Sequence, residues 1–312
     1  MSGILVSGSI AYDFIMDHGD DFSNSINKDN LDNLSVSFFI HKLKKEMGGT
    51  GLNIAYNFAM LGEKSILLGA AGDDFIFDGF MKEKINLNYL HISTELLSAS
   101  CYIISDPKSK QINAFYPGAM DMADTVSVND VSEELHYGIV SPNKKEAMLQ
   151  HIQELSELGV KSFFDPGQII FLFGKEELEQ ASKYADYLIV NEYEFEEFKQ
   201  KIGKNEGELL KDYEKIIVTL GGKGAKIIDS DGETLIEAVK IEKVVDPTGA
   251  GDAFRAGLII GLKGGYDFET SAKIGSICGA ECVQSHGGQN HSIHLEMIEK
   301  TMKENYQIDI KF

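Results

Sequence analysis

Apolar segments of strand length alternate regularly with segments of helical periodicity in the chain after residue 130. The sequence predicts three strands there, at 137–140, 161–164 and 187–190, and two helices, at 144–158 and 176–182. Strands that are separated by a helix lie parallel in one sheet, because the helix carries the chain back to the edge where it started. The alternation therefore predicts an α/β fold in which helices flank a doubly wound, mainly parallel sheet.

The rest of the chain adds further elements and two irregular segments. We expect strands at 4–9, 36–40, 66–71, 101–105, 111–115, 215–219 and 225–229 and helices at 50–61, 75–85, 253–263 and 268–283. The irregular segments, 11–45 and 97–120, are candidates for a small β lid. A large α/β domain would then comprise residues 1–10, 46–96 and 121–312.

The charge of the chain limits its partners. With 49 acidic and 29 basic residues the formal net charge is -20, which opposes binding to nucleic-acid backbones and to anionic membrane surfaces. A phosphate ligand must therefore be held locally, by backbone N–H groups, a metal ion or a few basic side chains. No stretch approaches the roughly 18 apolar residues of a membrane span, and the N-terminus does not resemble a signal peptide, so we expect a cytoplasmic protein.

The segment DPTGAGDAF at 246–254 is the strongest chemical signal in the sequence. It stands between an apolar run that ends at Val245, expected to be a strand, and the helix expected at 253–263. Glycines in such a turn let several backbone N–H groups converge, and a helix N-terminus adds roughly half a positive charge. The segment therefore predicts a site that stabilises a phosphate during its transfer.

Asp252 is the unusual member of this segment, because a carboxylate and a phosphate repel each other. Two explanations are open: the carboxylate accepts the proton of an attacking hydroxyl, or it caps the N-terminus of the helix. The sequence contains no G-x-x-x-x-G-K-[ST] segment, and this turn lacks the third glycine of G-x-G-x-x-G and lies far from the N-terminus. A P-loop and a nicotinamide-binding Rossmann fold are therefore disfavoured.

A second glycine segment, GGTGLNIA at 48–55, leads into the helix expected at 50–61. Gly48 and Gly49 permit close approach of the backbone to a ligand. Asn53, in the first helical turn, can offer a donor and an acceptor to a sugar hydroxyl. An ordinary glycine turn with a solvated Asn would give the same pattern. This segment therefore indicates a ligand site only in combination with the segment at 246–254.

Together the two segments resemble the paired signatures of the PfkB family, an early G-G-x-x-x-N element and a late D-T-x-G-A-G-D element, which here reads DPTGAGD. Their order and separation fit this resemblance over almost the whole chain. It implies a ribokinase-like fold with a small β lid, and an ATP-dependent kinase. It also implies that Asp252 is the general base and that the backbone of Gly249, Ala250, Gly251 and Asp252 forms the anion hole.

The resemblance assigns roles to other positions as well. Asp13, after the first strand, would bind two sugar hydroxyls through its paired oxygens. The substrate site would also contain Gly48, Gly49 and Asn53. Glu194, in an N-x-x-E element that begins at Asn191, would order the water shell of Mg²⁺. The ATP site would be formed by Asn191, Thr219, Gly221, Gly222, Gly224, Gly249 and Gly251.

Two further segments resemble nucleoside-phosphorylating members of the family, notably adenosine kinases. In AFYPGAM at 114–120, Phe115 would stack on a purine and Met120 would pack beside it, unless Phe115 fills a core under the lid. In DPGQ at 165–168, Gln168 is a candidate to bind a base edge, and Arg255 suits phosphate or the lid carboxylates. The expected reaction is phosphorylation of the 5′-hydroxyl of a purine nucleoside, either adenosine or a broader set.

The resemblance also indicates cations and partners. The expected cofactor is Mg²⁺ with ATP, and a monovalent cation such as K⁺ at Asp246 and Thr248 is a weaker hypothesis. The histidines His286, His291 and His294 lack the spacing of zinc ligands. We expect ATP and a nucleoside or sugar as ligands, no nucleic acid or membrane, and a homodimer in which the lid strands pair.

Two other functions remain open. A sugar kinase acting on ribose or fructose would share every residue that contacts phosphate. Only the aromatic residues of the lid favour a nucleoside kinase over it. A catalytically silent nucleotide-binding protein of the same fold would gain little from a carboxylate that faces phosphate.

Overall fold

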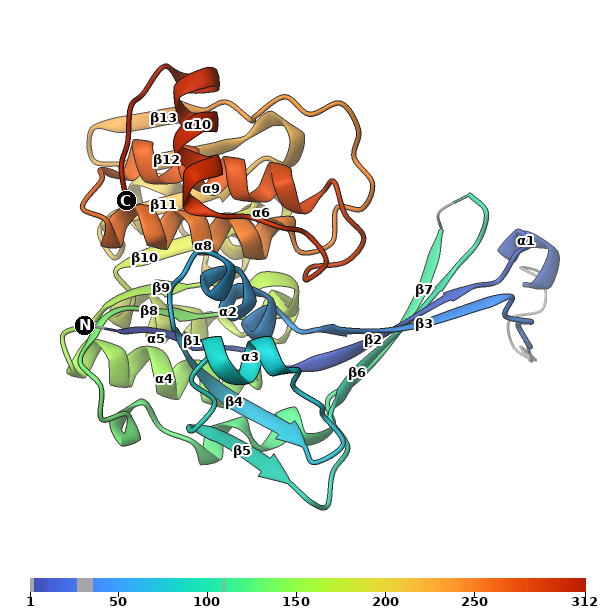
Figure 1. Ribbon diagram of the computed structural model, residues 1–312. Helices are drawn as coiled ribbons and strands as arrows, with labels where there is room; N and C mark the ends of the chain where they lie inside the picture. The colour runs from blue at the N-terminus through green and yellow to red at the C-terminus, as the bar shows by residue number, and fades with distance from the viewer. Residues whose placement is uncertain (1–2, 27–35, 109) are drawn as a thin grey trace.

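A large mixed sheet forms the centre of the computed structural model, which describes residues 3–26, 36–108 and 110–312. In this part of the chain nine strands follow one another in the order β13-β12-β11-β10-β9-β8-β1-β4-β5 (Figure 1). Their bounds are β1 Gly3–Ser7, β4 Ile66–Gly72, β5 Leu90–Ser93, β8 Leu135–Val140, β9 Lys161–Phe164, β10 Tyr187–Asn191, β11 Lys215–Thr219, β12 Ala225–Asp229 and β13 Gly232–Ile236. Neighbouring strands from β5 to β11 run parallel, and β12 and β13 add antiparallel pairs at one edge. The mainly parallel sheet that the alternation predicts is confirmed.

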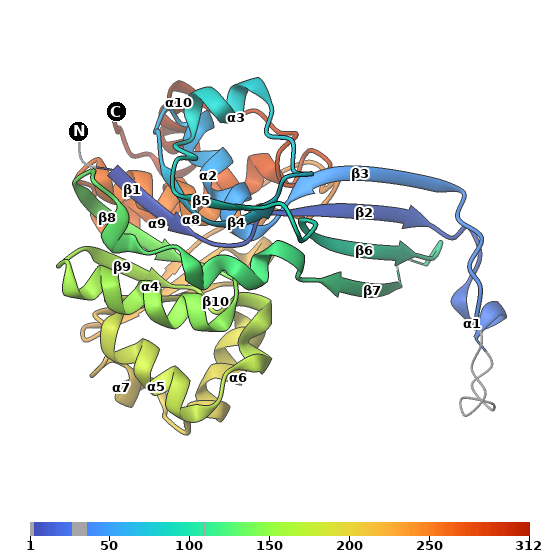
Figure 2. The same cartoon turned by 90° about the horizontal axis from the view of Figure 1, so that it is seen from below.

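Helices cover both faces of this sheet (Figure 2). One set comprises α2 Thr50–Met60, α3 Gly79–Lys84, α8 Ala250–Lys263, α9 Phe268–Cys282 and α10 Leu295–Tyr306, and the other α4 Lys145–Glu157, α5 Lys175–Tyr184, α6 Glu192–Ile202 and α7 Glu206–Leu209. Side chains alternate along β1, so that Ile4 and Val6 join the buried cluster under the first set and Leu5 joins the cluster under the second. Two apolar faces therefore explain why helices are needed on both sides.

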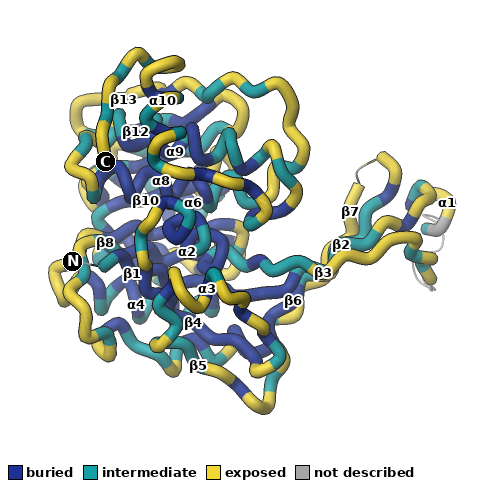
Figure 3. Tube along the Cα trace, in the orientation of Figure 1, coloured by how far each residue is buried: buried dark blue, intermediate teal, exposed yellow. Residues whose placement is uncertain are grey.

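A separate small sheet projects from the large body (Figures 1 and 2). Its strands, in the order β3-β2-β6-β7, are β3 Lys42–Gly48, β2 Ala11–Asp17, β6 Ala99–Ser105 and β7 Gln111–Tyr116, with α1 Phe22–Ser25 beyond its far end. Buried residues concentrate in the large body, whereas the outer part of the small sheet is mostly exposed or half-buried (Figure 3). This sheet is the predicted β lid.

One predicted element near the lid is wrong, and another begins later than predicted. Residues 36–40 form no strand; instead the ring of Phe38 packs edge-on against His18 and Phe22, with centroid distances of 4.8 and 5.3 Å. Aromatic packing therefore explains the apolar pattern there. The helix expected at 75–85 begins only at Gly79, because Asp78 caps it by accepting a hydrogen bond from the Met81 N–H group.

Two features are absent from the part of the chain that the structure describes. None of the helices there is both long and apolar enough to cross a membrane. The same part of the chain holds no group of three or more His, Cys, Asp or Glu side chains that could bind a metal ion.

Candidate active site

The segment at 246–252 forms a tight turn into the N-terminus of α8. Gly249 is the N-cap residue and has a φ of 80°, in the left-handed region that favours glycine. A Cβ atom at Gly249 would lie 2.4 Å from Cα of Gly288, so a neighbouring loop also excludes a side chain. The turn thus brings the backbone of Ala250 and Gly251 to the positive end of the helix dipole, as an anion site requires.

The chain before this turn is not a strand, contrary to the prediction. Residues 237–247 form neither helix nor strand, and the N–H groups of Val245 and Asp246 both donate to the carbonyl oxygen of Val283 at the end of α9. Val244 is 57% exposed. The apolar residues of this segment line a pocket instead of packing in the sheet.

Asp252 lies in the first turn of α8, whose capping residue is Gly249. Oδ2 of Asp252 accepts a hydrogen bond of 2.8 Å from Nδ2 of Asn53 on α2. Burial raises the pKa of Asp252 to about 7; Arg255 and Asn53 act to lower the pKa, and the Asp165 carboxylate adds to the rise. The capping explanation for Asp252 is therefore wrong, and the carboxyl group is suited to accept a proton near neutral pH.

Arg255 was expected to bind phosphate or the lid carboxylates; its partner in the structure is Asp165, which follows β9 in the large body. Nε and Nη2 of Arg255 donate to the two carboxylate oxygens of Asp165, each over 2.6 Å, in a bidentate pair. The side chains are 8% and 0% exposed. Burial acts to lower the pKa of Arg255. The Asp165 carboxylate has the larger, opposite effect and raises that pKa, so the guanidinium stays charged. The pair fastens α8 to the carboxyl end of β9.

Asp13 of β2 contributes a second carboxylate from the lid. It lies opposite Glu46 of β3 and Cys101 of β6, and Cys101 lies opposite Phe115 of β7. Side chains of paired residues share one face, so these four form a row across the lid sheet. Burial and the charge of Glu46 raise the pKa of Asp13 to about 6. A Cβ atom at Gly48 would lie 2.3 Å from Oδ2 of Asp13, so the carboxylate packs directly on the second glycine segment.

Of the three residues expected to meet a base, Phe115 and Gln168 are accessible and Met120 is buried. Phe115 is 50% exposed, so it does not fill a core under the lid, whereas Met120 is buried against Ala11. Gln168 is exposed in a 3-10 helix at Gly167–Leu172, just after β9. The structure thus places Asp13 and Phe115 on one face of the lid and Gln168 on a separate segment of the large body.

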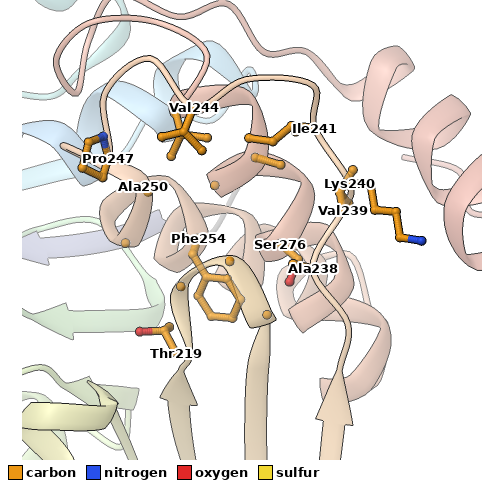
Figure 4. A pocket seen from close by; sticks show the side chains of 17 residues that line it. Thr219, Ala238, Val239, Lys240, Ile241, Val244, Pro247, Ala250, Phe254 and Ser276 are labelled. Atoms are coloured by element: carbon orange, nitrogen blue, oxygen red, sulfur yellow. The ribbon is translucent and has the colours of Figure 1, made fainter.

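A pocket of about 700 Å³ opens beside the N-terminus of α8 (Figure 4). Five of the seven predicted ATP-site residues line it, namely Thr219, Gly221, Gly222, Gly224 and Gly251, together with Ala250 of the turn, whereas Asn191 and Gly249 are not among its lining residues. Its apolar walls, which the sequence did not reveal, include Ala238, Val239, Ile241, Val244, Phe254 and Val283. Small apolar residues in an irregular segment form no motif, so only their position identifies them. The volume and the walls suit a flat nucleobase.

Asn191 and Glu194 form a reciprocal capping box at the start of α6. Oδ1 of Asn191 accepts from the Glu194 N–H group over 2.9 Å, and Oε2 of Glu194 accepts from the Asn191 N–H group over 2.8 Å. Glu194 is 7% exposed, and burial followed by the charge of Asp165 raises its pKa. The box places a carboxylate at the carboxyl end of β10, on the same side as Asp165.

The fold and the site define a small-molecule kinase of the ribokinase-like type: a mainly parallel sheet, a β lid, and an acidic residue in a glycine turn at a helix N-terminus. The chain belongs to the pfkB family of carbohydrate kinases, whose sequence model matches residues 4–295. The predicted family, fold class and kinase activity are confirmed.

Several nucleoside kinases and one ribokinase illustrate the similarity. A nucleoside kinase from Burkholderia thailandensis, solved in complex with inosine, has 32% sequence identity and a TM-score of 0.89, covering 99% of this chain and 100% of that one. A nucleoside kinase from Methanocaldococcus jannaschii is 30% identical over 261 residues, or 82% of this chain and 85% of that protein. A ribokinase from Lactococcus lactis is 26% identical over an alignment of 317 positions, gaps included, which covers 97% of this chain and 98% of that protein.

Proposed function

We propose that this chain transfers the γ-phosphoryl group of ATP to the 5′-hydroxyl of a purine nucleoside. The position of Asp252 carries the proposal: Asn53 holds its carboxylate at the start of α8, where the pocket meets the turn, and Asp13 of the lid is close enough to influence its pKa. Similarity to nucleoside kinases, one of them solved with inosine, supports a nucleoside as the acceptor.

In the proposed reaction, ATP occupies the pocket with its phosphates at the N-terminus of α8. The backbone N–H groups from Gly249 to Asp252 would form the anion hole that stabilises the transferring group. The 5′ oxygen forms a bond to phosphorus as the bond to ADP breaks, and its proton passes to Asp252. Because the transition state is loose, this proton leaves late, and the position of Asp252 matters more than its basicity.

The row of side chains across the lid supports a nucleoside over a bare sugar. Asp13 would accept hydrogen bonds from two ribose hydroxyls, and Gly48 and Gly49 would bring the backbone close to the sugar. Phe115 on β7 lies two strands away from Asp13 on the same face of the lid sheet, a separation of roughly 10 Å. This separation suits a base attached to the ribose that Asp13 would bind. Gln168 would reach the base edge from the large body when the lid sheet, made of β2, β3, β6 and β7, covers the substrate.

The residues near the anion turn fit Mg²⁺ carried by ATP. Oε2 of Glu194 is used in the capping box with Asn191, so the second carboxylate oxygen would bind a water molecule of the ion's shell. When bound, the ion would neutralise charge on the phosphates. The role of Asn191 is to hold Glu194 at that point.

A monovalent cation beside the turn is a second proposal. Oδ1 and Oδ2 of Asp246 accept hydrogen bonds of 2.9 Å from the N–H groups of Thr248 and Gly287. Burial acts to raise the pKa of Asp246, but these hydrogen bonds outweigh it and lower the pKa, so the carboxylate stays ionised. A negative carboxylate with the Thr248 backbone beside it suits K⁺. Equal turnover in K⁺ and tetramethylammonium buffers would contradict this role.

We also propose that two copies of the chain associate through their lids. On the face opposite Asp13, the ring of Phe14 stacks on Tyr102 at 4.9 Å, and Leu43, Ile112 and Tyr116 are 62%, 37% and 41% exposed. A second copy would cover this apolar face and the strand edges beside it. A monomer in sedimentation at micromolar concentration would contradict the proposal.

The sugar kinase is the second candidate, because the chain also resembles a ribokinase over nearly its whole length. A ribokinase would need Asp13 and Asp252 but would have no use for an exposed aromatic at Phe115. The silent nucleotide-binding protein is disfavoured by the place of Asp252 in the first turn of α8, since a protein that only binds nucleotide gains little from a carboxylate that faces phosphate.

A coupled ADP-release assay with ATP and Mg²⁺ tests the proposal. The acceptors are adenosine, inosine, guanosine, cytidine, ribose and fructose, each assayed with the wild-type chain and with the Asp252→Asn variant. Turnover with a purine nucleoside that the variant lacks supports the proposal. Turnover with free sugars alone would identify a sugar kinase and remove the role of Phe115. No ADP release with any acceptor would support the silent protein.

A further inference from the structure

A directional hydrogen-bond relay reaches Asp252 from Gln289, a residue that the sequence analysis did not single out. Nε2 of Gln289, in the segment between α9 and α10, donates to Oδ1 of Asn53 over 2.8 Å. Nδ2 of Asn53 then donates to Oδ2 of Asp252, also over 2.8 Å. Three segments of the chain therefore meet in one line of side chains.

The direction of this relay follows from chemistry. An ionised carboxylate only accepts hydrogen bonds, so Asn53 must present its NH₂ group to Asp252 and turn its carbonyl oxygen away. Gln289 supplies the donor that this oxygen needs. Oε1 of Gln289 is buried without a hydrogen-bond partner among the described residues, which is unfavourable. The Gln289 amide therefore keeps the orientation that donates to Asn53, although its own carbonyl oxygen is left without a hydrogen bond.

The loop that carries Gln289 is fixed at both of its ends. Before it, the Gly287 N–H group donates to Asp246, which also holds the anion turn through Thr248. After it, Nε2 of His291 lies 2.8 Å from Oδ1 of Asn57, one helical turn beyond Asn53 on α2. The loop thereby links α2 to the anion turn.

Close packing confines the relay. A Cβ atom at Gly288 would lie 2.9 to 3.0 Å from the side-chain atoms of Asn53, so the loop backbone presses against that amide. The Asn53 side chain therefore has little freedom to reach another partner. Its orientation depends on the donor that Gln289 offers.

We propose that Gln289 is a positioning residue for phosphoryl transfer, which holds the Asn53 amide in the orientation that donates to Asp252 and keeps that carboxylate ionised. The proposal rests on the proposed role of Asp252 as general base. Other groups also act on Asp252: Arg255 on α8, Asp165 after β9, Asp13 on β2 and Cys282 on α9. Because all of them remain when Gln289 is replaced, a change in the titration of Asp252 reports the relay.

The test compares the pH dependence of kcat for the wild type, Gln289→Leu and Gln289→Glu. Leucine removes the donor, and we expect the acidic limb of kcat to move up by about one pH unit, with kcat about tenfold lower below that limb. Glutamate offers an acceptor to Asn53 and turns its oxygen toward Asp252, so the limb should move further. Gln284→Leu is the matched control, because Gln284 is exposed at the end of α9 and bonds only there.

A purely structural role for Gln289 gives a different result. Weaker packing would lower the melting temperature and reduce kcat by the same factor at every pH, with the limb unmoved; that outcome overturns the proposal. If Gln289→Leu fails to fold, the polar Gln289→Glu variant carries the test. Asp252→Asn, assayed beside them, distinguishes failure of the relay from failure of the general base. Full activity in Asp252→Asn refutes the general base itself. An inactive Asp252→Asn, together with unmoved acidic limbs in both Gln289 variants, refutes only the relay.

Discussion

Asn53 and Asp252, 199 positions apart in the sequence, are joined by a hydrogen bond of 2.8 Å between the amide of one and the carboxylate of the other. The bond connects the two glycine segments, one at the start of α2 and the other at the start of α8. It restricts the carboxylate before a substrate arrives, so less conformational freedom remains to be lost during reaction.

Replacing Asp252 by Asn should leave ligand binding nearly intact and reduce kcat by about a hundredfold or more. Asn has nearly the same shape but cannot accept the proton of the attacking hydroxyl. Calorimetry would measure ATP and nucleoside binding, and ADP release would measure kcat. Asp267→Asn is the control, since Asp267 caps α9 and Asn caps equally well. Unchanged turnover in Asp252→Asn would remove this residue from the mechanism.

Turnover should rise with pH through about 7. The base must be ionised to accept a proton, and the pKa of Asp252 is raised to about 7, so kcat is low below that pH and constant above it. Asp13, with a pKa of about 6, should add a second rise to kcat/KM for the nucleoside, because the ionised carboxylate accepts two hydroxyls. Rate profiles from about pH 5 to about pH 9 would show both. An acidic limb near 4, the ordinary value for Asp, would contradict the buried setting of Asp252.

Replacing Gly48 by Ala should weaken nucleoside binding without affecting ATP. The new Cβ would lie 2.3 Å from Oδ2 of Asp13, so the carboxylate must move away from the sugar. We expect KM for the nucleoside to rise by about tenfold to a hundredfold and KM for ATP to stay within about twofold. Gly79→Ala is the control, because a Cβ added there would meet open space among the described residues beyond its own helix. Equal KM values in both variants would show that Asp13 does not bind the sugar.

Replacing Arg255 by Met should reduce the free energy of unfolding by about 3 to 5 kcal/mol, because Asp165 would remain as a buried charge without its partner. The double variant Arg255→Met, Asp165→Leu should lose less, since it buries no charge. Urea unfolding would measure both. Lys263→Met breaks a partly exposed pair with Glu63, and its effect should be about 1 kcal/mol or less. A similarly small effect in Arg255→Met would mean that the buried pair is not needed for stability.

Local sequence was sufficient for the fold class and the anion turn. The alternation of strands and helices repeats over many residues, and the turn is contiguous, with a glycine that its positive φ requires. The strands expected at 36–40 and before Val245 were wrong, because an apolar run packs equally well against aromatic rings or around a pocket. Short apolar runs do not reveal which surface they will cover.

What the sequence by itself determined is therefore the sheet, the lid and the glycine turn that holds Asp252. Only the tertiary structure decided the partners of that residue: Asn53 as its donor, Gln289 behind Asn53, and Arg255 committed to Asp165. The physical reason is the separation along the chain of the residues that interact. Secondary structure and turns depend on neighbours along the chain, whereas a hydrogen bond between distant side chains depends on how whole helices and loops pack.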